Sequence, residues 1–476
     1  MGTGHPVVPT TLDGVSIRLY DTSASQVRDF VPIVPGCVSI YLCGPTVQAP
    51  PHIGHIRSSL NFDIMRRWFA YRGYDVTFVW NMTDIDDKII AKSRETGLPW
   101  WQIGYANERA FNAGYDTLGC LPPTVEPRAT GHITEMVEMM EELIRRGHAY
   151  EADGNVYFSV TSYPDYLALS HQELENLRQP EGEGETGKRD QRDFALWKSA
   201  KPGEPSWPTP WGRGRPGWHL ECSAMVHKYL GSAFDIHGGG RDLIFPHHEN
   251  EIAQSKAFGD DFATYWVHNG WVTLSGEKMS KSLGNSVLVS EMVRKWRPIV
   301  LRYYLGTPHY RSMIEYSEEA LREAETGFAR IEGFAQRVTE LHGAVEPAPQ
   351  VPPAFAEAMD DDFAVPQALA IVHTAVRQGN AALAADDKEN AVARLAEVRA
   401  MLGVLGLDPL DAFWAGPAQG EDLHGVVDAL VKLVLEQRQA ARERKDYATS
   451  DAIRDRLTQA GLAIEDRADG SRWTLS

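Results

Sequence analysis

The chain has 476 residues, of which 43% are hydrophobic and 24% are charged, with a formal net charge of -18. This length exceeds the usual size of one hydrophobic core and predicts about two to four packed units, while the ordinary composition excludes an intrinsically disordered chain. No stretch approaches the ~20 apolar residues of a membrane span, and the net negative charge argues against indiscriminate nucleic-acid binding.

The first predicted unit is a strand, a helix and a second strand. The stretch CVSIYLCGPT, from Cys37, is typical of a buried strand that ends in a Gly-Pro turn. Apolar residues recur at helical spacing from Ile56 to Arg72, Gly73 stops the run, and Asp75–Trp80 follows as a strand. Such a motif favours a doubly wound parallel sheet, which binds ligands at the carboxyl ends of its strands.

The segment from Thr124 to Gly217 predicts an insertion. It contains a helix, short strands and the polar run QPEGEGETGKRDQRD, which cannot bury a core and is expected to be a mobile loop. The nucleotide-binding pattern resumes with FDIHGGG, a helix after Pro246 and YWVHNGWVTL, and it ends near Leu305. The sheet is therefore expected to be split by the insertion.

Helices dominate the sequence after Ser317. Ala- and Glu-rich stretches with apolar residues three and four apart predict a helical bundle. The last stretch, Asp422 to Ser476, predicts a basic amphipathic helix ending in RQAARERK, a helix stopped by Gly461, and a hairpin around Asp469-Gly470.

The predicted fold class is α/β. A doubly wound, Rossmann-like parallel-sheet catalytic domain split by an insertion is followed by an α-helical bundle and a small C-terminal mixed α/β domain. The predicted ranges are 20–123 and 218–305 for the split catalytic domain, 124–217 for the connective insertion, 306–419 for the bundle and 420–476 for the C-terminal domain.

The cysteines and the N-terminal segment indicate the compartment. The chain has four cysteines, too few and too scattered for a secreted disulfide framework, and no basic start followed by an apolar run. We therefore expect reduced thiols in a cytoplasmic protein that does not associate with a membrane.

The first chemical motif is His52-Ile53-Gly54-His55, which follows the first strand and opens the first helix. Gly54 lets the backbone approach a nucleotide, and imidazoles at a helix N-terminus can bond phosphate oxygens in the transition state. Taken alone, a solvated turn is the simpler interpretation of this motif.

The second motif, Lys278-Met279-Ser280-Lys281-Ser282, lies between Gly276 and Gly284. Its two lysines could neutralise the charge that develops as pyrophosphate leaves a triphosphate. An exposed charged loop is the alternative. The two motifs in this order resemble the signatures of class I aminoacyl-tRNA synthetases, whose ATP site lies between them.

Four residues form a candidate metal site: Cys43, Cys222, His247 and Glu251. His247 and Glu251 are four residues apart and share one helix face, whereas His248 and Glu249 are expected to point elsewhere. Two cysteines, a histidine and a glutamate suit Zn²⁺ better than a hard cation. Buried free cysteines and a simple helix pair are the alternative interpretation.

Eight blocks of sequence together resemble the signatures of the cysteinyl-tRNA synthetase family, in family order. They are CGPTV...HIGH, NMTDIDDKI, LPPTVEPRATGHI, DFALWK, GWHLECSAM, FDIHGGGRDLIFPHHENEIAQS, GEKMSKSLGN and AMDDDFAVPQAL. The resemblance implies that cysteine and ATP form cysteinyl-adenylate, that the cysteinyl group passes to tRNA(Cys), and that zinc selects the substrate thiolate.

The resemblance also implies roles for particular residues. The implied ligands of one Zn²⁺ per chain are Cys43, Cys222, His247 and Glu251. The implied catalytic residues are His52, His55, Lys278 and Lys281. The implied contacts with ATP, for which Mg²⁺ is expected, are Gly54, Gly240, Asp242 and Lys281. The implied cysteine pocket is Gly44, Thr46, Thr83, Trp218 and His237. Residues 306–419 would bind the tRNA stem and 420–476 the anticodon, in a monomer.

Three other functions share parts of this pattern. A cysteine ligase that acts on an amino-sugar would share every motif up to the lysine loop, but it would not need the helical and basic C-terminal region. A zinc hydrolase would use Glu249 as base, but the spacing is not HExxH. A non-catalytic zinc-stabilised RNA-binding module would give the lysine loop no task.

Overall fold

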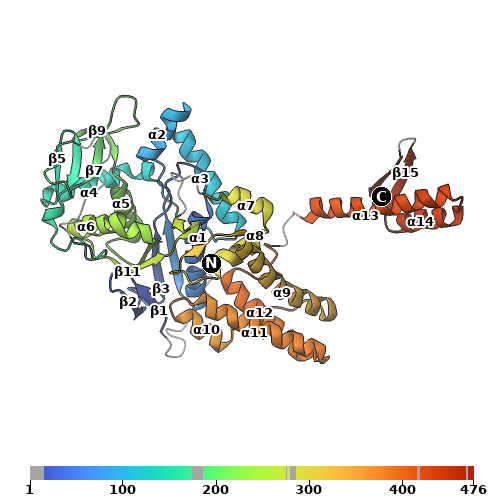
Figure 1. Cartoon of the computed structure of the whole chain (residues 1–476). Helices are drawn as coiled ribbons and strands as arrows, with labels where there is room; N and C mark the ends of the chain where they lie inside the picture. The colour runs from blue at the N-terminus through green and yellow to red at the C-terminus, as the bar shows by residue number, and fades with distance from the viewer. Residues whose placement is uncertain are drawn as a thin grey trace, which may run out of the picture. The chain divides into compact units, whose positions relative to one another are not determined.

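The computed structural model describes residues 16–173, 186–274, 276–278, 286–414, 419–467 and 470–475. The chain forms two compact units, Met1–Pro409 and Leu410–Ser476 (Figure 1). Among the described helices, none combines the length and the apolar character needed to cross a membrane.

The centre of the first unit is a four-stranded parallel sheet in the order β11-β10-β3-β4. Its strands are β3 Cys37–Leu42, β4 Asp75–Trp80, β10 Ala233–Gly240 and β11 Phe262–Asn269. β10 joins β3 in parallel, with Ile236 opposite Ile40. Strands from both halves of the catalytic sequence thus form one sheet, which confirms the predicted split.

The helices of the catalytic part pack on this sheet or on one another. They are α1 Ile53–Tyr71, α2 Asp87–Thr96, α3 Trp100–Thr117, α5 Trp218–Leu230, α6 Glu249–Phe258, α7 Val289–Lys295 and α8 Pro298–Gly306. The apolar side chains of α1 recur at helical spacing, and Leu60 and Trp68 are fully buried. The helix ends before Gly73, whose φ of 87° is readily adopted by glycine. The predicted helix is confirmed, with a start three residues earlier.

Smaller elements complete the catalytic part. They are β1 Arg18–Asp21, β2 Gln26–Asp29, η1 Ala129–His132, η2 Val160–Ser162, η4 Arg241–Leu243, the π turn η5 Ile244–His248, β12 Val272–Leu274, β13 Glu277–Lys278 and β14 Ile314–Glu315. β12 pairs with both β13 and β14, and the hairpin β12–β13 leads into the lysine motif.

The insertion contains more sheet than its sequence indicated. Helix α4 Ile133–Arg145 is followed by the antiparallel strands β5 Ala149–Ala152, β6 Asn155–Phe158, β7 Phe194–Ser199, β8 Trp207–Thr209 and β9 Gly212–Pro216. These strands are short, and a segment such as GRGRP lacks the apolar alternation that marks a strand. The loop predicted to be mobile lies partly outside the described residues, which omit 174–185.

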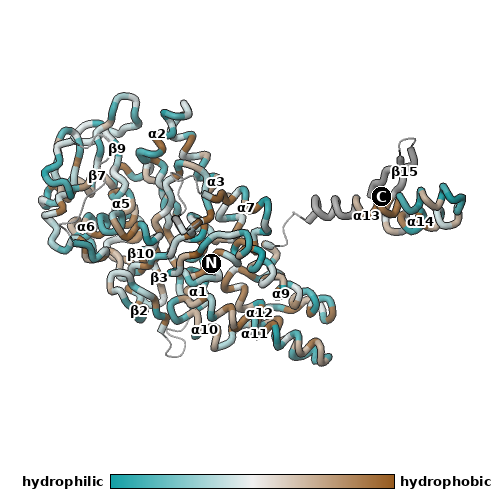
Figure 2. The backbone as a smooth tube through the Cα atoms, viewed as in Figure 1, coloured by the Kyte–Doolittle hydropathy of each residue, from teal (hydrophilic) through white to brown (hydrophobic). Residues whose placement is uncertain are grey.

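The helical bundle consists of α9 Glu318–His342, α10 Pro353–Asp360, α11 Val365–Ala384 and α12 Lys388–Leu405. Hydrophobic and hydrophilic stretches alternate along these helices in Figure 2, as expected for helices with one buried face. Phe328 and Phe334 of α9 and Leu395 of α12 are fully buried. The predicted bundle is confirmed.

The second unit contains two helices and a hairpin. They are α13 Gln419–Glu443, α14 Tyr447–Gln459, β15 Leu462–Arg467 and β16 Gly470–Leu475. The strands are antiparallel, with Arg467 opposite Gly470. The predicted hairpin is therefore confirmed, although Asp469 at its turn lies outside the described residues.

A buried ion pair connects the sheet domain to the bundle. Arg302 of α8 is fully buried; its Nη2 lies 2.6 Å from Asp63 Oδ2 of α1 and its Nε donates to the Leu405 carbonyl of α12 at 3.0 Å. Burial alone would raise the pKa of the Asp63 carboxyl, but the charges of Arg302 and Arg67 hold it below its usual value. The charged form of Asp63 therefore serves as the counter-ion of the buried Arg302 guanidinium.

We expect Asp63→Ala to lower the free energy of unfolding by about 3–5 kcal/mol, because it leaves the Arg302 guanidinium buried without its counter-ion. Urea unfolding of the parent and variant measures this difference. The folded carboxyl has the lower pKa, so its contribution is complete above the unfolded value near ~3.9 and is lost as pH falls through the folded value. The gap between parent and variant should therefore narrow in acid.

A matched control is Arg322→Ala, which removes an exposed i,i+4 partner of Glu318 on α9. This pair is solvated, so the control should change the free energy of unfolding by less than about 0.5 kcal/mol. If Asp63→Ala and Arg322→Ala lower the free energy of unfolding equally, the buried pair is no more stabilising than an exposed one and the prediction is wrong.

Candidate metal and nucleotide site

Four side chains that the sequence marks as metal ligands converge at the carboxyl ends of β3 and β10. The candidate ligand atoms of Cys43, Cys222, His247 and Glu251 all lie within 4.8 Å of one another. Cys43 Sγ is 3.3 Å from Glu251 Oε1 and 3.7 Å from Cys222 Sγ. His247 Nε2 is 2.9 Å from the same Glu251 oxygen. The loop after β3, helix α5, the turn η5 and helix α6 supply one residue each.

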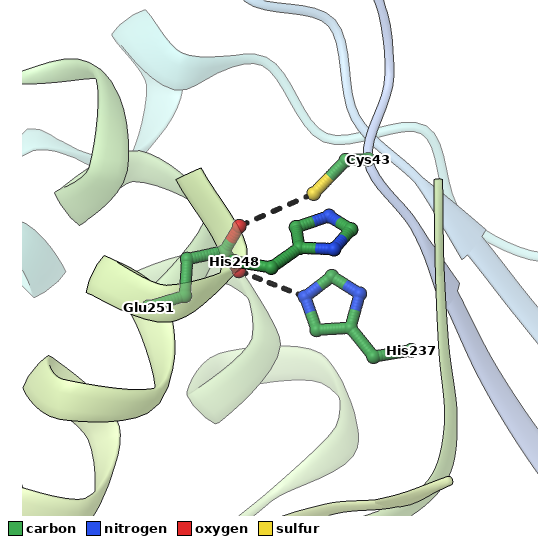
Figure 3. Close-up of side chains that lie close together, drawn as sticks. All are labelled: Cys43, His237, His248 and Glu251. Atoms are coloured by element: carbon green, nitrogen blue, oxygen red, sulfur yellow. Dashed lines mark hydrogen bonds and ion pairs between the residues drawn. The ribbon is translucent and has the colours of Figure 1, made fainter. Parts of the chain in front are cut away.

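A second group shares two of these residues. The candidate ligand atoms of Cys43, His237, His248 and Glu251 also lie within 4.8 Å of one another, and Figure 3 shows both imidazoles beside the Glu251 carboxylate. His237 Nε2 lies 2.8 Å from Glu251 Oε2. The prediction that His248 points elsewhere is wrong. His248 precedes Glu251 by three residues and His247 precedes it by four, so both side chains can lie on the Glu251 face of the helix, and both are buried.

The donor atoms of the cluster fit zinc. The first group, with two thiols, one imidazole and one carboxylate, offers the softer ligands. The second group, with one thiol, two imidazoles and one carboxylate, also suits zinc. Among the described residues, Nδ1 of His237 and Nε2 of His248 lack a hydrogen-bond partner although both rings are fully buried. A cation bound near Glu251 would offset the free-energy cost of burying these unpaired imidazole nitrogens.

Charges within the cluster favour a carboxylate at Glu251 and a thiolate at Cys222, but they also favour the protonated form of His247. Burial lowers the pKa of His247, yet Glu251 and Cys222 raise it to about 10. Burial opposes ionisation of Glu251, but the imidazoles of His237 and His247 hold the pKa of its carboxyl well below the usual value. Burial would likewise raise the pKa of the Cys222 thiol, yet hydrogen bonds from Cys43 and His247 lower it to about 6. The pKa of Cys43 is raised by burial and by Cys222. The site therefore favours a carboxylate and one thiolate before a metal binds.

The loops after β3 and β4 hold three predicted pocket residues beside the cluster. Gly44 N donates to Asn81 Oδ1 at 2.9 Å, and a Cβ at position 44 would lie 1.5 Å from the Asn81 carbonyl oxygen. Only glycine fits there. Thr46 and Thr83 form a parallel β-bridge, and Thr83 is 1% exposed. The structure thus brings Gly44, Thr46 and Thr83 together.

Two histidines contact Trp218, a fourth predicted pocket residue. Its ring stacks on His247, with centroids 4.2 Å apart and planes inclined by 21°. His219 Nδ1 lies 3.0 Å from His247 Nδ1, and burial together with the charge of His247 lowers the pKa of His219 well below its usual value. Sequence reasoning missed His219. Its position three residues before Cys222 on α5 would have placed it on the same helix face.

The two histidines of the first motif cap α1. His52 Nδ1 accepts a hydrogen bond from Gly54 N at 3.1 Å, His55 Nδ1 accepts one from His52 N at 3.3 Å, and the rings stack 3.6 Å apart. Because each Nδ1 accepts a backbone N–H, the ring proton of each neutral imidazole is on Nε2. The cap therefore fixes the orientation and the tautomer of both rings.

The remaining predicted nucleotide residues lie at the end of β10 and in the lysine loop. Gly240 ends β10, and Asp242 Oδ1 accepts from Trp271 Nε1 at 3.2 Å. The Lys278 backbone pairs with Thr273 in the β12–β13 hairpin. Lys281 lies outside the described residues.

Three family profiles match consecutive parts of the chain. Residues 29–326 match the profile described as "tRNA synthetases class I (C) catalytic domain". Residues 354–409 match the "DALR domain", and residues 424–473 match the "Cysteinyl-tRNA ligase anticodon binding domain". The catalytic profile alone covers more than half of the chain.

Similar proteins agree with these profiles. The chain is 81% identical to the cysteine–tRNA ligase of Streptomyces avermitilis over 97% of this chain and 99% of the relative. It is 80% identical to that of Streptomyces griseus over the same shares, and 78% identical to that of Streptomyces coelicolor over 100% of this chain and 79% of the relative. Among solved structures, Mycobacterium tuberculosis methionyl-tRNA synthetase with methionyl-adenylate matches with a TM-score of 0.57 at 16% identity, covering 78% of this chain and 90% of that one. That likeness shows the fold.

Proposed function

The chain belongs to the cysteinyl-tRNA synthetase family of class I aminoacyl-tRNA synthetases, and from that premise we propose how its own residues perform the reaction. Cysteine and ATP form cysteinyl-adenylate and pyrophosphate, and a hydroxyl of the terminal adenosine of tRNA(Cys) then takes the cysteinyl group. The observation that carries this proposal is the Cys/Cys/His/Glu cluster, at the edge of the sheet where α1 begins with two histidines.

The first test is amino-acid-dependent exchange of pyrophosphate into ATP, screened over the twenty amino acids. Only cysteine should support rapid exchange. Rapid exchange with serine, or none with cysteine in the metal-loaded protein, would contradict the proposed assignment of the pocket.

We assign the cysteine site to residues at and beside the cluster. The proposed ligands of one zinc ion are Cys43, Cys222, His247 and Glu251. The proposed pocket residues are Gly44, Thr46, Thr83, Trp218 and His237. When bound, zinc offers the substrate sulfur a soft metal bond and favours its thiolate form, whereas a hydroxyl ionises far less readily. The fully buried His237 supports this pocket through its contact with Glu251.

We place the nucleotide between the histidine motif and the lysine loop. The proposed ATP contacts are Gly54, Gly240, Asp242 and Lys281, with Mg²⁺ accompanying the phosphates. The proposed catalytic residues are His52, His55, Lys278 and Lys281. The cap of α1 supports this assignment because it turns both Nε2–H groups into donors for phosphate oxygens. Positioning and charge stabilisation carry the displacement, so no protein nucleophile is required.

We divide the chain into four functional parts. Residues 20–123 and 218–305 would catalyse adenylation, 124–217 would connect the halves, 306–419 would bind the tRNA stem, and 420–476 would bind the anticodon. The match of residues 424–473 to an anticodon-binding profile supports the last assignment. We expect a monomer in the cytoplasm.

Removal of residues 420–476 should leave cysteine-dependent pyrophosphate exchange largely intact, because every proposed adenylation residue precedes this region. Charging of tRNA(Cys) should fall more than about tenfold, the factor that a loss of ~1.4 kcal/mol in RNA binding produces. Exchange and charging are measured on the same preparation. Equal loss of both activities in a folded protein would contradict the division.

Two alternative functions have less support. The match of residues 424–473 to an anticodon-binding profile opposes a ligase that acts on an amino-sugar. Against a zinc hydrolase, the Glu249 carboxylate accepts hydrogen bonds from Leu167 N at 2.8 Å and Ser170 N at 2.7 Å, so it holds a loop rather than facing the cluster.

A further inference from the structure

A buried arginine follows the histidine motif on α1. Arg57 is fully buried, and its guanidinium donates to four backbone carbonyls. Nη1 bonds Gly270 O at 2.6 Å and Trp271 O at 3.1 Å, and Nη2 bonds Ser312 O at 2.6 Å and His309 O at 3.3 Å. Gly270 and Trp271 directly precede β12, the strand that leads into the lysine loop. Arg57 therefore ties the histidine helix to one end of that loop.

Neighbouring contacts strengthen the same connection. Ser58 Oγ donates to Asn269 Oδ1 at 2.8 Å. Gly270 N donates to Tyr310 O at 2.8 Å, and a Cβ at position 270 would lie 2.4 Å from Ser312 O. The close approach of the two backbones at this point thus needs glycine. Together these contacts set where β12 starts relative to α1.

The other end of the lysine loop is tied to the same place. Ile53 N donates to Val287 O at 3.0 Å, and Val289 N donates to Pro51 O at 3.1 Å. His52 and Leu288 form an antiparallel bridge. Both ends of the segment that carries the lysine motif are therefore held by residues within five positions of the two histidines.

We propose that Arg57 is a positioning residue for adenylation, which sets the distance and orientation between the two catalytic histidines and the lysine loop. This inference rests on the proposed roles of His52, His55 and Lys281. The guanidinium suits the task because its planar fork bonds carbonyls of two segments at once, the approach to β12 and the loop before β14. A lysine at this position keeps the charge but loses the fork.

The proposal predicts a kinetic signature for Arg57→Lys. The pre-steady-state rate constant of cysteinyl-adenylate formation should fall about 10- to 100-fold, the scale expected when catalytic groups are misplaced by about 1 Å. The Kd for cysteine should stay within about twofold, because the cysteine pocket lies on other segments. Gly270→Ala, which forces the two backbones apart without changing charge, should give the same signature.

Two comparisons separate positioning from simple stabilisation. In the Lys281→Ala background, Arg57→Lys should cost clearly less than it does in the parent, because one of the two catalytic lysines whose position it sets is gone. Arg302→Lys is the matched control, since Arg302 is equally buried and also donates to carbonyls, at Leu405 and Leu118. It should lower Tm and leave the adenylation rate of the folded protein unchanged.

All rates are measured well below the lowest Tm of the set. If Arg57→Lys and Gly270→Ala lower Tm but keep the parental adenylation rate, the positioning role is wrong and Arg57 is only structural. Independent, multiplicative effects of Arg57→Lys and Lys281→Ala would likewise overturn the positioning role. The parent's own cysteine-dependent rate is measured first, so failure of the proposed function is recognised separately.

Discussion

Replacing Lys281 by alanine should lower the rate constant of cysteinyl-adenylate formation by about 100- to 1,000-fold, while the Kd for cysteine stays nearly unchanged. The ammonium is proposed to meet the charge that develops on the leaving pyrophosphate, which is larger in the transition state than in bound ATP. An interaction made chiefly in the transition state affects the rate and not the ground-state affinity. Rapid quench measurement of adenylate, with equilibrium binding of cysteine, separates the two quantities.

The matched control for this experiment is Lys295→Ala in α7. Lys295 is an exposed lysine that follows the same loop, and its Nζ lies 3.9 Å from Glu318 Oε1. It should retain the parental rate. An unchanged rate in Lys281→Ala, or a parallel loss in Lys295→Ala, would remove the proposed role of the lysine loop.

Replacing Cys222 by serine should cost the protein both its metal and its selectivity. A serine hydroxyl is a poor ligand for zinc, and even changes outside the ligand shell weaken metal binding by about 10–100-fold, so a larger loss is expected here. Without the metal, shape alone distinguishes cysteine from serine, and shape provides only about 10–200-fold discrimination. Bound zinc is measured by mass spectrometry, and selectivity by the ratio of kcat/KM for the two amino acids.

Cobalt substitution gives an independent spectroscopic test. Cysteine added to the cobalt form of the parent should produce new sulfur-to-metal charge-transfer absorption, and serine should not. The control is Cys37→Ser at the exposed first position of β3, far along the strand from Cys43, which should keep the metal and the spectrum. Retention of metal and selectivity in Cys222→Ser would show that another group, such as the imidazoles of His237 and His248, holds the ion.

Local sequence patterns were sufficient for much of the fold. The helix with His52 and His55 has a regular apolar spacing, a glycine stop and a cap within a few residues, so nearby sequence determines its limits. The insertion was harder to predict, because its five antiparallel strands have only three to six residues each and one of their pairings, β6 with β7, joins residues 36 to 41 positions apart, such as Tyr157 and Ala195. Such pairing leaves little periodicity in the sequence.

The site was less accessible to sequence reasoning. Its four predicted metal ligands do come together, but His248 also enters the cluster, and its spacing of three residues from Glu251 was a signal that the prediction did not use. Arg57 shows a different limit. A charged residue on a helix is normally assigned to the surface, and only the four carbonyls contributed by residues more than 200 positions later explain its burial.

The split of the catalytic sheet has a consequence for folding during synthesis. The contact of Ser39 with Asp235 joins β3 to β10 across 196 residues. At ribosomal rates of about 5–20 residues per second, β3 waits on the order of 10–40 s for that neighbour after it is made. The insertion, whose strands pair mostly with near neighbours in the chain, can form its own hairpins within this interval. Until β10 arrives, one edge of β3 offers unpaired backbone groups to other chains, so the nascent protein is most exposed to aggregation before its last two parallel strands are complete.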